Sequence, residues 1–219
     1  MNDKVLVLAV HPDDETLGCG GALLKHKLEG DNIHWLICTS LNATDENYDK
    51  REEEISKVSK EYGFSSTHNL RLDTMRVDEY SVSDLVGKIS EVIQKIQPTI
   101  IYLPFKSDVH SDHRAIFSAA YSCTKSFRYP YIKKIYMMET LSETEFSPST
   151  KEDAYIPNVF VDITDHIEKK LEIMKLYEGE VGEHPFPRSI RGLKALSTLR
   201  GSTAGCEYAE SFVLLKEIR

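Results

Sequence analysis

The sequence lacks the features that mark a secreted or membrane-bound protein. Its four cysteines stand far apart and form no C-x-x-C pair, which argues against a cysteine zinc site and against a disulfide scaffold. No apolar stretch approaches the roughly 20 residues that span a bilayer, and the apolar run over residues 5–10 is too short for a signal-peptide core. We therefore expect a cytoplasmic protein with no targeting segment and no membrane anchor.

Basic runs are absent as well. The net charge is -8, whereas a nucleic-acid-binding protein usually concentrates Lys and Arg on one face. The chain has 219 residues, enough for one domain with a substantial core, and it carries no repeat, low-complexity tract or linker. We predict a single domain over residues 1–219 and no nucleic-acid partner.

Apolar runs that suit buried strands alternate along the chain with segments of helical periodicity. The expected strands cover residues 4–10, 33–39, 69–72, 99–103, 134–139 and 159–161. The expected helices cover residues 22–29, 50–62, 82–96, 112–124 and 164–177, the last with Thr164 as its N-cap. This order predicts an α/β fold, with a Rossmann-like, mostly parallel sheet flanked by helices. The polar residues 141–157 are expected to form a surface loop.

Two clusters of histidine and acidic residues each follow a predicted strand. The first holds His11, Asp13 and Asp14, and the second holds His110 and His113. Because the carboxyl ends of parallel strands meet at one edge of a sheet, we expect the clusters to converge. Imidazole and carboxylate ligands suit zinc, and three protein ligands leave a position for water. A structural histidine, or acidic residues that complement a helix N-terminus, would explain either cluster alone, so the coincidence of both is what favours a metal site.

Other signals in the sequence are weaker. Gly18, Gly20 and Gly21 follow the spacing G-x-G-G rather than the G-x-G-x-x-G of dinucleotide sites, and close packing of a helix on the sheet explains them adequately. His184 is interpreted as loop structure. The remaining histidines show no clustering and are interpreted as structural: His26, His34, His68 and His166.

Several motifs together resemble one known family. Residues 9–15 read AVHPDDE and residues 17–21 read LGCGG, while residues 110–113 (HSDH) form an H-x-x-H element. The pair Arg51 and Glu54 and the segment 205–212 add looser matches. The set is similar to the LmbE-like, or PIG-L, de-N-acetylases, and the likeness touches nearly the whole chain.

The resemblance implies a function and a division of roles. It implies zinc-dependent hydrolysis of the N-acetyl amide of an N-acetylated amino sugar, such as an N-acetylglucosamine derivative, or of a related small molecule. It implies His11, Asp14 and His113 as the Zn2+ ligands. Asp13 would be the general base, and His110 would stabilise the oxyanion as an imidazolium. The resemblance is also compatible with a homo-oligomer.

Two further residues are candidates for substrate binding. Arg51 would hydrogen-bond substrate hydroxyls from the rim of the site, and a salt bridge with Glu53 or Glu54 is an equal alternative. Asp73, after the third predicted strand, would reach a sugar hydroxyl, although a turn residue would explain it too. Residues 141–157 and 183–188 are expected to set specificity.

Two other functions stay open at this point. One is a metal-dependent hydrolase of a different bond, such as a phosphoester, but that chemistry usually calls for phosphate-binding cations or a second metal. The other is a non-catalytic small-molecule binding protein on a nucleotide-binding fold. Such a protein would not need a free Asp13 beside Asp14, nor His110 beside His113, and it should be indifferent to chelation.

Overall fold

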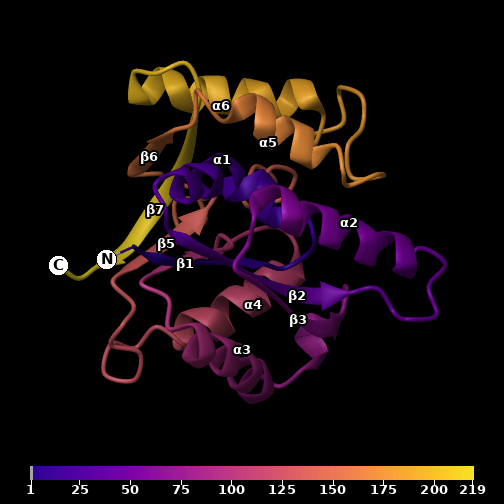
Figure 1. Ribbon diagram of the computed structural model, residues 1–219, viewed down its shortest axis with the longest axis vertical. Helices are drawn as coiled ribbons and strands as arrows, with labels where there is room; N and C mark the ends of the chain where they lie inside the picture. The colour runs from indigo at the N-terminus through magenta and orange to yellow at the C-terminus, as the bar shows by residue number, and fades with distance from the viewer. Residues whose placement is uncertain (1) are drawn as a thin grey trace.

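The apolar run near the N-terminus forms an interior strand of a seven-stranded sheet in the computed structural model, which describes residues 2–219 (Figure 1). The strands lie in the order β3-β2-β1-β4-β5-β7-β6. They are β1 (Lys4–Ala9), β2 (Asn32–Ser40), β3 (Ser66–Asp73), β4 (Ile100–Leu103), β5 (Lys134–Met138), β6 (Val159–Asp162) and β7 (Ala209–Glu217). The first five are parallel, and β7 runs antiparallel to both β5 and β6. The predicted α/β fold with a mostly parallel sheet is confirmed.

Helices cover both faces of this sheet. They are α1 (Asp14–Leu28), α2 (Tyr48–Tyr62), α3 (Val82–Ile96), α4 (Ser111–Ser122), α5 (Ile167–Met174) and α6 (Ile190–Ala204), with a short 3-10 helix η1 (Val77–Glu79). Figure 1 shows α1, α2, α5 and α6 on one face and α3 and α4 on the other. Buried hydrophobic side chains form two clusters, one on each face of the sheet. Val5 and Val7 of β1 belong to one cluster and Leu6 and Leu8 to the other, so β1 is buried on both sides. None of the helices in residues 2–219 is long and apolar enough to cross a membrane.

The sheet order reverses at β1, which creates the place for a site. β1 pairs with β2 on one side and with β4 on the other, with Val5 opposite Ile33 and Ile100. In open α/β sheets, ligands bind beyond the carboxyl ends of the strands at such a switch point. The loops after β1 and β4 meet there, as the sequence predicts.

Helix α1 begins at Asp14, earlier than the predicted start at residue 22. Its two parts join at Cys19, whose backbone is non-helical (φ -148°, ψ 20°), and its glycines weaken the helical pattern in the sequence. A Cβ atom on Gly18 would lie 2.7 Å from Met138 Sδ, and one on Gly21 would lie 2.6 Å from Ile163. Close packing on the sheet therefore accounts for these glycines, as expected.

A buried ion pair fixes α1 at this kink. Lys170 Nζ lies 2.8 Å from Glu210 Oε1 and donates to the Leu17 carbonyl at 3.0 Å. The Glu210 carboxylate accepts the backbone N–H groups of Gly21 and Ala22 at 2.8 Å each. Segments from α5 and β7 thus hold the helix whose first turn carries Asp14.

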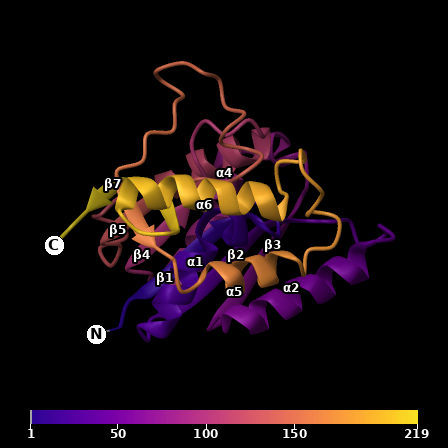
Figure 2. The same cartoon turned by 90° about the horizontal axis from the view of Figure 1, so that it is seen from above.

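The C-terminal third differs most from expectation. α5 is shorter than the predicted helix 164–177, and Thr164 is not its N-cap, because its hydroxyl donates to Asp162 Oδ1 at 2.6 Å in a turn. Helix α6 and strand β7 had no prediction. Residues 141–157 form a loop between β5 and β6, as predicted, and arch away from the helices in Figure 2.

Candidate metal centre and active site

Three ligand atoms from the loops after β1 and β4 meet at the switch point. His113 Nε2 lies 3.4 Å from His11 Nδ1 and 3.4 Å from Asp14 Oδ2, and the latter two atoms are 4.0 Å apart. A tetrahedral zinc ion with bonds of about 2.0–2.1 Å separates its ligand atoms by about 3.3 Å. Two separations match this value and the third is slightly wider. The donor set of two imidazoles and one carboxylate therefore fits zinc.

Asp14 is held in place by the backbone that precedes it. Its Oδ2 accepts the N–H groups of Val10 and His11 at 2.8 Å each. Asp14 also opens helix α1, where a negative charge is favourable. The turn between β1 and α1 thus fixes this carboxylate beside both imidazoles.

Each of the two imidazoles has a carboxylate on its other nitrogen. For His11, Nε2 lies 3.3 Å from Asp112 Oδ2, and the Asp112 carboxylate also accepts the backbone N–H groups of Met75 and Val77 at 2.7 and 3.2 Å. Asp112 is fully buried. This contact places the His11 proton on Nε2 and turns the lone pair of Nδ1 toward Asp14 and His113.

His113 is oriented in the same way from α4. Its Nδ1 lies 2.8 Å from Asp108 Oδ2, and the Thr144 hydroxyl donates to Asp108 Oδ1 at 2.7 Å. Burial alone would lower the pKa of His113, but the carboxylates of Asp14 and Asp108 outweigh it and raise that pKa to about 9. The surroundings of His113 therefore favour positive charge, whether a proton or a metal ion supplies it.

Asp108 and Asp112 are supporting residues that were not predicted from the sequence. Both lie within the segment that contains His110 and His113, so the signal was present: acidic residues beside histidines that are candidate ligands.

We expect Asp108→Asn to weaken zinc binding by about 10–100-fold, the usual effect of losing such a partner. A zinc titration against a competing chelator measures this affinity.

Asp31→Asn is a matched control for that prediction, because Asp31 makes a 2.8 Å contact with His26 away from the cavity. It should leave zinc affinity unchanged. If Asp108→Asn bound zinc as tightly as the unaltered chain, Asp108 would not be a support for the metal ligand.

Asp13 stands beside the three ligand atoms without being one of them. It precedes the first turn of α1 with φ 135°, a backbone conformation that is uncommon for a non-glycine residue. It is 4% exposed and lines the cavity. Burial, reinforced by the negative charges of Asp14 and Glu180, raises the pKa of Asp13 well above its usual range. This carboxylate is therefore poised to hold a proton.

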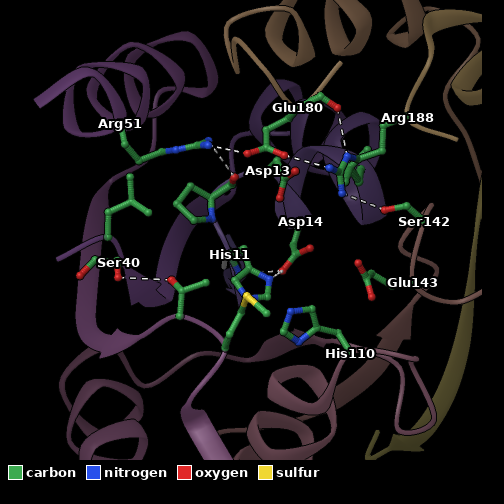
Figure 3. Close-up of a pocket in the computed structure, with 15 residues that line it drawn as sticks. His11, Asp13, Asp14, Ser40, Arg51, His110, Ser142, Glu143, Glu180 and Arg188 are labelled. Atoms are coloured by element: carbon green, nitrogen blue, oxygen red, sulfur yellow. Dashed lines mark hydrogen bonds and ion pairs between the residues drawn. The ribbon is translucent and has the colours of Figure 1, made fainter. Parts of the chain in front are cut away.

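His110 lies on the opposite side of the ligand atoms from Asp13 (Figure 3). It is the N-cap of α4, and its Nδ1 accepts the backbone N–H of Asp112 at 3.1 Å. Burial, together with the neighbouring His11, lowers the pKa of His110. Because Nδ1 accepts this N–H, Nε2 is the nitrogen left to donate toward the cavity, and the lowered pKa works against the imidazolium expected from the sequence.

A cavity of about 230 Å3 opens over these residues. Its upper wall in Figure 3 carries Arg51, Glu180 and Arg188, with Ser142 beside Arg188 and Glu143 below them, nearer to His110. Sequence reasoning missed Glu180 and Glu143, because they come from loops that only the folded chain brings to β1. The predicted specificity segments 141–157 and 183–188 do reach the cavity, through Ser142, Glu143 and Arg188.

Both sequence interpretations of Arg51 agree with its position. The side chain lines the cavity, and its Nη1 lies 3.3 Å from Glu54 Oε2. The glutamate that it contacts at the rim is Glu180, however, and not Glu53, which pairs with Lys57 at 2.8 Å.

Asp73 and the other histidines lie outside the cavity. Asp73 ends β3, where its Oδ2 accepts the Tyr80 hydroxyl at 3.1 Å and its carbonyl accepts the N–H of Arg76 in a turn. These contacts suit the turn residue that the sequence offered as the alternative, and the substrate-binding role of Asp73 stays a prediction. His26, Glu29 and Asp31 form another group of donor atoms, but the His26 nitrogens already contact Asp31 at 2.8 Å and the Tyr102 hydroxyl at 3.0 Å.

The fold and the site together define a class of protein: an α/β scaffold with a His-Asp-His donor set at its switch point and a separate carboxylate alongside. The chain belongs to the GlcNAc-PI de-N-acetylase (PIG-L) family, whose model matches residues 6–124. It is 25% identical over 218 residues to the diacetylchitobiose deacetylase of Thermococcus kodakarensis, covering 94% of this chain and 81% of that protein.

Solved structures share the fold. A conserved protein from Thermus thermophilus superimposes with a TM-score of 0.79 at 24% identity, covering 100% of this chain and 97% of the other. The N,N'-diacetylchitobiose deacetylase from Pyrococcus horikoshii, in complex with its inhibitor, gives a TM-score of 0.78 at 20% identity, covering 98% and 84%. The likeness therefore extends over the whole chain.

Proposed function

We propose that this chain is a zinc-dependent deacetylase that hydrolyses the N-acetyl amide of an amino sugar or a related small molecule. The observation that carries the proposal is the set of three converging ligand atoms with the unligated Asp13 beside them in the cavity wall. The family and its named deacetylases support the same reaction class.

His11, Asp14 and His113 would hold the zinc ion. When bound, zinc supplies a Lewis acid that polarises the amide carbonyl and lowers the pKa of a water molecule to about 7. The buried Asp108 and Asp112 would fix the orientation of both rings, because each accepts the N–H of one imidazole and leaves the other nitrogen facing the metal position.

Asp13 would move the proton in both halves of the reaction. It accepts a proton from the attacking water as the oxygen bonds to the amide carbon, and it then gives that proton to the nitrogen as the C–N bond breaks. The products are acetic acid and the free amine, which become acetate and the ammonium form when the acid proton passes to the amine, so atoms and charge balance. A buried carboxylate with a raised pKa suits this double task.

His110 would donate its Nε2–H to the carbonyl oxygen, where negative charge develops. A single donor of this kind is typically worth about 10²–10³ in rate. Its backbone contact with Asp112 fixes the ring before substrate arrives, so no reorganisation is needed at the moment of reaction.

The cavity size favours a single sugar unit at the reacting end. Sites for drug-sized ligands occupy about 300–1,000 Å3, whereas this cavity is about 230 Å3. Arg51 at the rim would hydrogen-bond sugar hydroxyls. By analogy with the diacetylchitobiose deacetylase it resembles, we propose an N-acetylglucosamine unit as the group bound.

The phosphoester alternative finds little support in the charges of the cavity. Its two cationic side chains, Arg51 and Arg188, both contact Glu180, and Asp13, Asp14 and Glu143 add further carboxylates. Apart from the proposed zinc ion, a phosphate would meet side chains of compensated or negative charge.

The test compares amide and phosphoester substrates on the same protein. N-acetylglucosamine, diacetylchitobiose and a nitrophenyl phosphate are incubated with the chain, and amine, acetate and phosphate are measured. We expect amine and acetate in equal amounts from at least one sugar and no phosphate. Phosphate release without amine would refute the proposal in favour of the phosphoesterase, and no product from any substrate would favour the binding protein.

A further inference from the structure

Glu180 stands between two guanidinium groups at the rim of the cavity (Figure 3). Arg51 Nη2 lies 2.5 Å from Oε1 of Glu180, and Arg188 Nη2 lies 3.0 Å from Oε2. The Glu180 carbonyl also accepts the Nε–H of Arg188 at 3.0 Å. Each oxygen of this carboxylate therefore holds one arginine.

These contacts leave little free positive charge at the rim. Arg51 is also 3.3 Å from Glu54, so its charge has two carboxylate neighbours. Arg188 gives a further N–H to Ser142 Oγ at 2.9 Å, which ties the two loops of the rim together. An incoming anion would have to displace Glu180 or lie beside it.

Apart from the proposed metal ion, other side chains of the cavity wall are also unfavourable to anions. Asp13 and Glu143 line the cavity, and within residues 2–219 Glu143 Oε2 is a buried atom with no hydrogen-bond partner. A carboxylate oxygen without a donor can be satisfied by a ligand hydroxyl or N–H, but not by another anion. The polar groups of the cavity thus suit a neutral ligand rich in donors.

We propose that Glu180 is a specificity-determining residue that selects N-acetyl substrates with neutral hydroxyls at the rim of the cavity and rejects those with a phosphate or carboxylate there. The inference rests on the proposed deacetylase function. A sugar hydroxyl can donate to Glu180 and leave both arginines in place, whereas an anion loses the attraction of two guanidinium groups that the protein already uses.

The experiment measures substrate preference in Glu180→Gln. For the unaltered chain and the variant, kcat/KM is determined for N-acetylglucosamine, its 6-phosphate and N-acetylmuramic acid, which are neutral, phosphorylated and carboxylated. We expect the anionic-to-neutral ratio to rise about tenfold or more for at least one anion, because two guanidinium donors become available to it. A residue that only supports the fold would lower all three values together.

Two further variants make the outcome decisive. Glu139→Gln removes a half-buried carboxylate that contacts Arg200 at 2.9 Å outside the cavity, and it should leave the ratio unchanged. Arg188→Met added to Glu180→Gln should reduce the gained preference for anions. If folded Glu180→Gln kept the ratio of the unaltered chain, or if Glu139→Gln raised it equally, the inference would be wrong.

Calorimetric Kd values for the same three sugars separate this inference from the proposed function. Sugar binding without amine release in the unaltered chain would refute deacetylation alone, and the Kd ratio would then decide the role of Glu180. An unchanged Kd ratio in Glu180→Gln, or no binding of any sugar, would overturn the inference.

Discussion

Replacing His113 with alanine is expected to remove zinc and amine release together. His113 Nε2 lies 3.4 Å from both of the other ligand atoms, so the substitution leaves only His11 and Asp14. Because a metal ion contributes several kcal/mol to a hydrolytic reaction, the rate should fall by roughly three orders of magnitude or more. Zinc per chain by elemental analysis and amine release on the same sample measure both effects.

Two other variants serve this test. His26→Ala removes a half-buried histidine outside the cavity, and it should keep both zinc and activity. Because His113 is fully buried, replacing it with alanine also leaves an internal void that can destabilise the fold. Asp14→Asn is the milder second variant, because an amide oxygen can still accept the N–H groups of Val10 and His11. Full zinc content with normal activity in a folded His113→Ala protein would refute the ligand assignment.

Replacing Asp13 with asparagine is expected to keep zinc but to slow turnover by roughly two to four orders of magnitude, the usual worth of a general base. An amide cannot take the proton from water or return it to the amine. Asparagine is the suitable replacement because it tolerates positive φ better than alanine does, and Asp13 has φ 135°. Steady-state kcat beside zinc content is the measurement.

Asp45→Asn is the matched control for Asp13, since Asp45 is an exposed turn residue whose carboxylate accepts the N–H of Asn47 at 2.8 Å. It should change neither quantity. An unchanged rate in Asp13→Asn would remove Asp13 from the mechanism, and a joint loss of zinc and activity would make it a part of the metal site instead.

The parallel strands β1 to β5 could be predicted because each is marked by an apolar or β-prone run within its own residues. The wholly apolar residues 5–10 indicate a strand buried on both faces, and β1 has helices on both sides. The position of the two histidine clusters after strands then follows from the parallel arrangement. β7 is different, because it enters the sheet between β5 and β6 by antiparallel pairing that depends on contacts distant in the sequence.

The start of α1 shows a second limit. Helical periodicity in the sequence is interrupted by three glycines and by the non-helical Cys19, so only the segment from residue 22 reads as a helix. What holds the kink is the buried pair of Lys170 and Glu210, and neither residue is near α1 in the sequence.

In the site, the residues that the motifs contain were predictable and the residues that surround them were not. His11, Asp14 and His113 converge as the sequence indicates. Asp73 lies outside the cavity and accepts the Tyr80 hydroxyl, and the end of a strand does not show in the sequence which way its side chain will bond. Glu180 carries no local signal, and its place between two arginines arises only when its loop folds over β1.

The most direct test of the metal-dependent mechanism is zinc stoichiometry combined with chelation. The chain is purified without chelator, its zinc is counted, and amine release from an N-acetyl sugar is followed through metal removal and zinc readdition. The His-Asp-His site predicts about one zinc per chain, activity lost on removal and activity restored by zinc. Amine release that persists after complete metal removal would contradict it.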